Sequence, residues 1–147
     1  MFKIQKKVLY AIEAVIDIAI NSGTEPVQNI AIARRQGIPK RYLEQTLQSL
    51  VKKNILVGSR GPKGGYRLAK ERRKIKLSDI IHSVSDEKNL SQEMSSEIAQ
   101  KIVNPLLKEM TTKCEDFLGN ITVNAICETA KKKKIQKLIK KKADFVI

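Results

Sequence analysis

Residues 37 to 45 read GIPKRYLEQ, and residues 60 to 68 read RGPKGGYRL. The first stretch opens a segment in which apolar residues recur at helical spacing, with long polar side chains between them. A short apolar pattern precedes it and stops at Gly37, and Pro39 suits the start of the next helix. A short helix, a glycine turn and a second helix with a polar face are typical of a helix-turn-helix. The apolar positions of the two helices are Val27, Ile30, Ala31 and Ala33, then Leu43, Leu47, Leu50 and Val51.

The second stretch lies between two short β-prone runs and contains a Gly/Pro loop, which predicts a β-hairpin. A further amphipathic helix is expected upstream, over about residues 5 to 21, and a short fourth helix over residues 77 to 84. Three helices followed by a hairpin are the order of a winged helix. The fold class is therefore mainly α with a small β-hairpin.

These two elements together indicate nucleic-acid binding. A helix rich in Lys, Arg and Gln can enter the major groove, about 12 Å wide, and a Gly-rich loop lets its flanking arginine approach the minor groove. Taken singly, a solvated helix face and an ordinary turn explain each element equally well, but their order and separation place both on one side of a domain. The candidate DNA contacts are Lys40, Arg41, Tyr42, Glu44, Gln45, Gln48, Ser49 and Lys52 on the helix, and Arg60, Lys63 and Gly64 on the hairpin.

Beyond residue 86 a long helix with an apolar seam is predicted, because apolar residues recur every three or four positions over about seven turns. Pro105 interrupts it, so we expect a bend close to Val103. A lone helix of this kind cannot bury its seam against a domain that already has a core, which points to a homodimer. The expected dimer contacts are Ile98, Ile102, Leu106, Met110, Cys114 and Phe117.

The charge distribution supports this division. The 147-residue chain has a formal net charge of +14, which favours polyanionic partners. Residues 1 to 86 hold 17 basic and 7 acidic side chains, residues 87 to 130 hold 4 and 7, and residues 131 to 147 hold 8 and 1. We expect a DNA-binding domain, a segment with a dimerisation helix and a short closing helix, and a lysine-rich tail. The most apolar stretch, residues 8 to 20, contains two acidic residues, so we expect a cytoplasmic protein without a membrane partner.

The sequence contains no pattern typical of an active site or a metal site. The two cysteines, Cys114 and Cys127, cannot form a closed four-ligand metal site and are expected to be small buried apolar residues. His82 is the only histidine, so it is assigned a structural role, and the commonest general base is missing. The loop at residues 61 to 65 lacks the Lys-Ser/Thr of a P-loop and leads into a strand. We expect no enzyme activity, no metal and no cofactor.

Short motifs over most of the chain also carry a family resemblance. They are Tyr10-Ala11, Pro26-Val27, Ile30-Ala31, Gln36-Gly37-Ile38, Tyr42-Leu43-Glu44-Gln45, Leu50, Arg60-Gly61-Pro62, Gly64-Gly65-Tyr66, Asp79-Ile80-Ile81, Val84, Phe117-Leu118 and Asn120-Ile121-Thr122. In these motifs the chain resembles the Rrf2 family of bacterial winged-helix transcription regulators. The resemblance implies that the helix from Lys40 is the recognition helix, that Arg60 is the wing arginine, and that the long helix forms a dimer.

The chain departs from this family at one functional position. Cluster-binding members carry three cysteines in a loop that corresponds here to about residues 86 to 103, and this segment has no cysteine. It looks more like an extension of the long helix, with Ser91 as its N-cap. The sequence therefore does not predict an iron-sulfur cluster.

The function predicted from the sequence is a homodimeric, sequence-specific regulator that binds double-stranded DNA. An alternative is a basic RNA- or ribosome-associated protein in which the lysine-rich tail binds and the winged helix is a scaffold. A refinement of the first interpretation is a redox sensor that acts through Cys114 and Cys127. The operator, the sign of regulation and any effector remain open.

Overall fold

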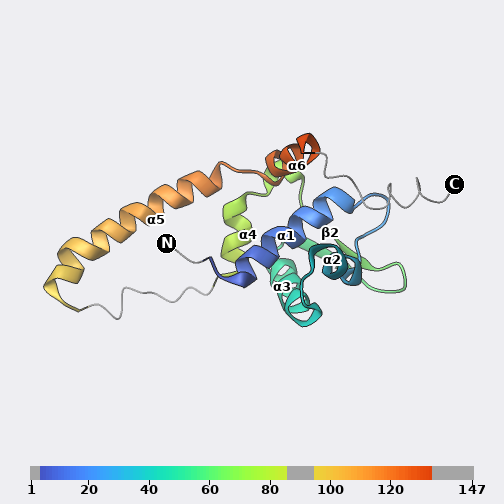
Figure 1. Cartoon of the computed structure of the whole chain (residues 1–147), viewed down its shortest axis with the longest axis horizontal. Coiled ribbons are helices and arrows are strands. Elements are labelled where there is room, and N and C mark those ends of the chain that lie inside the picture. Colours follow the sequence, from blue (N-terminus) through green and yellow to red (C-terminus); the bar gives the residue numbers. More distant parts are fainter. Residues whose placement is uncertain (1–3, 86–94, 134–147) are drawn as a thin grey trace.

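The computed structural model describes residues 4–85 and 95–133, which form a mainly helical fold with one antiparallel hairpin (Figure 1). Its elements are α1 (Lys6–Asn21), α2 (Asn29–Gln36), α3 (Lys40–Lys52), β1 (Leu56–Ser59), β2 (Gly65–Leu68), the 3₁₀ helix η1 (Arg72–Lys74), α4 (Leu77–Val84), the π-helix η3 (Ala99–Val103), α5 (Asn104–Gly119) and α6 (Val123–Lys132). The predicted fold class is confirmed. No helix in the described ranges is long and apolar enough to cross a membrane.

The core is built around α1, which contacts α2, α3, α4, α6 and β2. Because it is surrounded, α1 is buried on several sides, with Ala11, Ala14, Val15 and Ile18 fully inaccessible. Leu43, Leu47 and Leu50 of α3 pack into the same core as predicted.

Two residues that were predicted to lie in the core are exposed. Ile30 is 52% exposed and Val51 is 38% exposed, whereas Ile32, absent from the predicted stripe, is fully buried. The helix α2 has only eight residues, so its few apolar positions do not determine which side faces the core. In α3 the flank opposite Val51 carries Thr46, which is buried and donates its hydroxyl hydrogen bond to the Tyr42 carbonyl at 2.8 Å. The buried side of α3 is therefore rotated toward Thr46 and away from Val51.

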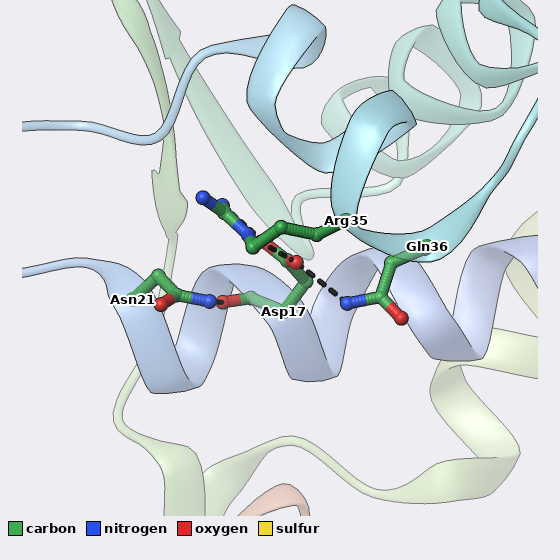
Figure 2. Close-up of polar contacts among 4 residues, drawn as sticks. All are labelled: Asp17, Asn21, Arg35 and Gln36. Atoms are coloured by element: carbon green, nitrogen blue, oxygen red, sulfur yellow. Dashed lines mark hydrogen bonds and ion pairs between the residues drawn. The ribbon is translucent and has the colours of Figure 1, made fainter. Parts of the chain in front are cut away.

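A buried ion pair joins α1 to the end of α2 (Figure 2). The Arg35 guanidinium donates to both carboxylate oxygens of Asp17, from Nε at 2.8 Å and from the terminal nitrogen at 2.7 Å. Gln36 Nε2 adds a third hydrogen bond at 2.7 Å. The Asp17 side chain is inaccessible to solvent and Arg35 is 12% exposed, and the hydrogen bonds that Arg35 donates to Asp17 raise the pKa of Arg35. Three charge-assisted contacts therefore set the position of α2 on α1.

The hairpin is anchored to the loop between α1 and α2. β1 and β2 pair with Leu56 opposite Leu68 and Ser59 opposite Gly65. Val27 forms an isolated bridge with Tyr66, with N–H···O distances of 2.9 and 2.8 Å, and extends the sheet by one residue. Arg67 donates to the Gly23 carbonyl at 2.9 Å and to the Thr24 carbonyl.

The long helix extends away from the helices around α1 (Figure 1). Ser96 Oγ accepts a hydrogen bond from the Ala99 N–H at 3.1 Å, and Ser95 is not helical. The sequence predicted that this helix extends back to a cap at Ser91, which lies outside the described residues; among the described residues the helix begins after Ser96.

The bend expected near Val103 takes the form of the π-helix η3. The Asn104 N–H reaches the Ala99 carbonyl, five residues back, and Pro105 lies in the first turn of α5. Pro105 has no N–H to donate to Lys101, and its ring would crowd that carbonyl in a regular α-helix. Widening the preceding turn removes this conflict, which is a common role of a π turn.

The closing helix α6 returns to the core. The Thr122 side chain caps it by accepting from the Ala125 N–H at 3.1 Å, and Val123 and Cys127 join the same cluster as α1. From the sequence this helix was grouped with the predicted dimerisation helix. In the structure it packs against α1 and η1.

Removal of the Asp17 carboxylate should destabilise the fold strongly. We expect Asp17→Ala to lower the free energy of unfolding by about 3 kcal/mol or more, because it leaves the Arg35 guanidinium without its partner in a mostly dry site. Urea denaturation measures this loss. Glu13→Ala, on an exposed position of the same helix, should change the stability by no more than about 0.5 kcal/mol. Equal effects of the two substitutions would contradict the structural role of the pair.

Candidate nucleic-acid interface

The exposed face of α3 carries most of the predicted contacts. Arg41, Gln45, Gln48 and Lys52 are all exposed, on the side opposite the buried leucines. No ion pair in the described part of the chain involves these four side chains. Ser49 is half-buried, and its hydroxyl donates to the Gln45 carbonyl at 3.2 Å. The helix thus presents a row of unpaired long donors and acceptors.

A groove of about 630 Å³ separates α3 from the hairpin. Gln48, Val51 and Lys52 line it from α3, and Arg60 lines it from the hairpin. The third wall comes from the start of α2, including Ile30. The exposure of Ile30 and Val51 therefore has a common explanation, since both form apolar parts of this groove.

A second groove, of about 490 Å³, lies on the other flank of α3, toward the start of α1. Tyr42, Gln45 and Ser49 line it from α3, and Lys6 and Lys7 line it from α1. The sequence analysis did not identify these two lysines as candidates. Their only signal was two adjacent basic residues at a helix start, which is common on protein surfaces. Lys40 and Glu44 are exposed but line neither groove.

The turn of the hairpin presents Arg60 and Lys63 to solvent, whereas Gly64 is buried. A Cβ at Gly64 would lie 2.4 Å from the Ser59 carbonyl oxygen. Gly65 has φ +154°, and its Cβ would lie 2.5 Å from the Val27 carbonyl oxygen. We expected these glycines to permit close approach of nucleic acid. That role stays a prediction, and their surroundings show that close packing inside the turn and against Val27 also requires them.

The two cysteines and the histidine line neither of these grooves. Cys114 on α5 is exposed in the single chain, so its expected burial on the dimer seam stays a prediction, while Cys127 on α6 is buried and burial raises the pKa of its thiol. The exposure of Cys114 follows from its place on the projecting helix α5. His82 has the expected structural contact, since its Nε2 lies 2.7 Å from Glu115 Oε1 and joins α4 to α5.

Residues 4–129 match the family model Rrf2, described as an iron-dependent transcriptional regulator. The chain belongs to the Rrf2 family. It is 31% identical to the HTH-type transcriptional regulator IscR of Vibrio campbellii over 128 residues, which are 84% of this chain and 76% of that protein. The IscR of Pectobacterium atrosepticum is also 31% identical, over 84% of this chain and 78% of that protein.

Solved structures of Rrf2 proteins share the fold. T. potens IscR matches with a TM-score of 0.76 and 30% identity, over 90% of this chain and 91% of that one. The oxidized form of Staphylococcus aureus CymR matches with a TM-score of 0.69 and 28% identity, over 86% of this chain and 97% of that one. This chain is therefore a DNA-binding transcription regulator, a non-enzymatic function.

The iron in the family description can be tested against the residues of this chain. In the described ranges no three His, Cys, Asp or Glu side chains come together as a metal site. The sequence of residues 86 to 94 contains neither cysteine nor histidine. The two cysteines lie on different helices, one exposed and one in the core. These residues do not fit a cluster held by three cysteines ahead of the long helix.

The packing of Gly65 leads to a stability prediction. We expect Gly65→Ala to lower the free energy of unfolding by about 1 to 3 kcal/mol, because the new Cβ strains the backbone and meets the Val27 carbonyl. The matched control is Gly23→Ala, where a Cβ meets nothing within 4 Å. Urea midpoints compare the two variants. A Gly65→Ala midpoint equal to that of the control would show that the bridge between Val27 and Tyr66 contributes little.

Proposed function

We propose that this Rrf2 protein acts as a homodimer that reads a two-fold symmetric DNA sequence and works without an iron-sulfur cluster. In each protomer α3 enters the major groove, the hairpin reaches the adjacent minor groove, and α5 pairs with the second copy. Two recognition helices then meet half-sites about one helical turn, or a small multiple, apart.

The observation that carries this proposal is the free polar face of α3 between two grooves. A helix in the major groove has a phosphate backbone on either side, so a reading helix needs space along both of its flanks. Lys52 and Arg60 border one flank, and Lys6 borders the other. These cations suit phosphate contacts that orient the domain, while Gln45 and Gln48 suit hydrogen bonds to base edges, adenine in particular.

The hairpin supports a separate contact. Arg60 and Lys63 are exposed in the turn, next to the closely packed Gly64 and Gly65. The negative potential of a narrow minor groove favours a guanidinium group. Arg60 is thus proposed as the minor-groove contact.

The apolar seam of the long helix supports the dimer. Ile98, Ile102 and Leu106 are each more than 60% exposed in the single chain, and Phe117 is 67% exposed. Contiguous apolar surface of this kind marks a protein interface. Cys114 lies on the same seam, where a second copy would cover it.

Selection of binding sequences from random duplex DNA tests this proposal. The full chain should enrich a symmetric sequence. We expect Gln45→Ala to change the enriched bases, and Arg60→Ala to weaken binding to the selected duplex by about 1 to 3 kcal/mol. Lys108→Ala, on α5 away from both grooves, should change neither quantity.

Two results would contradict the assignment of α3 as the reader. One is that no sequence is enriched by the folded protein. The other is that Gln45→Ala retains the wild-type preference while removal of residues 131 to 147 abolishes it. The second result would favour an RNA- or ribosome-associated protein that binds through its tail.

Disruption of the seam should produce monomers. We expect Leu106→Glu to weaken self-association by about a hundredfold or more, because each dimer loses two buried leucine contacts, worth roughly 3 kcal/mol or more together, and gains two charges at the interface. Sedimentation equilibrium measures the change. Lys108→Glu places the same glutamate on the opposite side of α5 and should leave the association intact. Equal association of both variants would exclude this seam as the interface.

The cysteine content leads to a metal prediction. Protein purified without oxygen should be colourless and contain no stoichiometric iron, because residues 86 to 103 lack the cysteines that would hold a cluster. Visible spectroscopy and iron analysis measure this. Cluster absorption that disappears on replacement of Cys114 or Cys127 would contradict the proposal.

A further inference from the structure

A second basic surface lies away from the recognition helix. It is formed by residues 70 to 74, which include η1, and by the end of α6, and η1 and α6 contact each other. We call it the η1–α6 surface. Its exposed cations are Lys70, Arg73, Lys74, Lys131, Lys132 and Lys133.

Both elements are fixed to the rest of the domain. Arg72 of η1 is half-buried and donates a hydrogen bond to the Ala19 carbonyl at the end of α1, and η1 and α6 contact each other directly. The Val123 N–H also donates to the Ile75 carbonyl at 2.9 Å. The lysines of α6 and the cations around η1 therefore belong to one fixed arrangement.

The cations of this surface have no partners within the described chain. None of the ion pairs in residues 4–85 and 95–133 includes any of the six side chains. Two acidic residues on these elements, Glu71 and Glu128, are exposed and offset only part of the charge. Uncompensated charge of one sign repels itself in the folded state and attracts a polyanion.

The η1–α6 surface faces away from the DNA-reading side. α3 and α6 lie on opposite sides of α1, as Figure 1 shows. The polar face of α3 points away from α1, since its buried face packs on α1. DNA has a persistence length of about 150 base pairs, so a short duplex held by α3 does not curve round to the far side of the same domain.

The composition of the surface distinguishes between polyanions. Around its lysines the exposed residues of α6 are Ala125, Glu128 and Thr129, with no exposed aromatic or large apolar side chain. Proteins that bind single strands without sequence preference stack bases on aromatic rings. Helices that bind membrane surfaces insert large apolar residues. A surface of point charges alone fits the phosphate backbone of a duplex.

We propose that the η1–α6 surface binds the phosphate backbone of a second segment of double-stranded DNA while α3 holds the first. The protein would thereby bridge two duplexes, or two distant parts of one. This binding does not depend on base sequence, because lysine and arginine contact phosphates here as point charges. The proposal goes beyond the reading of an operator. It rests on the proposed contact of α3 with DNA, but it does not require that α3 select a sequence.

A two-duplex capture experiment tests the proposal with the full chain. The protein is saturated with a fluorescent duplex obtained by the selection, then mixed at 50 mM salt with a biotinylated random-sequence duplex, and the fluorescence on streptavidin beads is measured. We expect wild-type protein to carry the fluorescent duplex to the beads. For the variant with Arg73→Gln, Lys74→Gln and Lys131→Gln we expect the captured fluorescence to fall about tenfold or more. Each phosphate contact adds about 0.9 to the slope of log affinity against log salt, so the loss of three contacts weakens binding strongly at low salt. Its affinity for the fluorescent duplex in solution should stay within about twofold of wild type.

A matched variant controls for net charge. Lys101→Gln, Lys108→Gln and Lys113→Gln remove three charges from exposed positions of η3 and α5, and capture should stay at the wild-type level. Equal capture by the two triple variants would overturn the proposal. So would stronger capture when single-stranded RNA replaces the biotinylated duplex. If the selection yields no preferred sequence, a fluorescent random duplex replaces the selected one, and the same comparison of variants still decides this proposal separately from sequence-specific reading.

Discussion

The contact between Asp17 and Arg35 determines how the DNA-binding parts are placed. A carboxylate without solvent contact is strongly unfavourable unless its hydrogen bonds are satisfied, and here three donors from the end of α2 satisfy it. Both oxygens of Asp17 are used, so rotation of α2 about α1 would break at least one bond (Figure 2). Directly after α2 the chain turns at Gly37, with φ +65°, and enters α3. The position of the reading helix thus follows from a polar contact at the edge of an otherwise apolar core.

The core explains which parts of the chain act as one body. The helix α1 contacts helices from both ends of the sequence, and α6 contributes Val123 and Cys127 to the same cluster. Boundaries derived from charge and composition separated these elements, because composition does not register contacts between distant segments. The long helix between them leaves the core and returns with α6. Toward its C-terminal end α5 contacts α4, where His82 meets Glu115.

The sequence predicted the order and type of the elements well, because leucine periodicity, Gly37, Pro39 and the Gly-rich turn act locally. It predicted the exposed face of α3 for the same reason. The functions of Asp17 and Gly64 were missed, since one depends on a partner eighteen residues away and the other on a close approach to Ser59 that only the folded turn creates. Ile30 was predicted to be buried, but Ile32 is buried in its place, because an eight-residue helix contains too few turns to define its buried side. The second basic surface also escaped detection, as its cations come from segments about sixty residues apart.

The π turn before Pro105 affects more than the direction of the helix. Ile98, Ile102, Leu106, Met110 and Cys114 are spaced by four residues at every step. An α-helix completes a turn in 3.6 residues, so a row with this spacing drifts steadily around the helix axis. A π turn takes more residues to complete, and the row drifts the opposite way where it crosses η3. The widened turn therefore partly resets the phase of the row, and the residues before and after Pro105 stay closer to one line than a regular helix would allow.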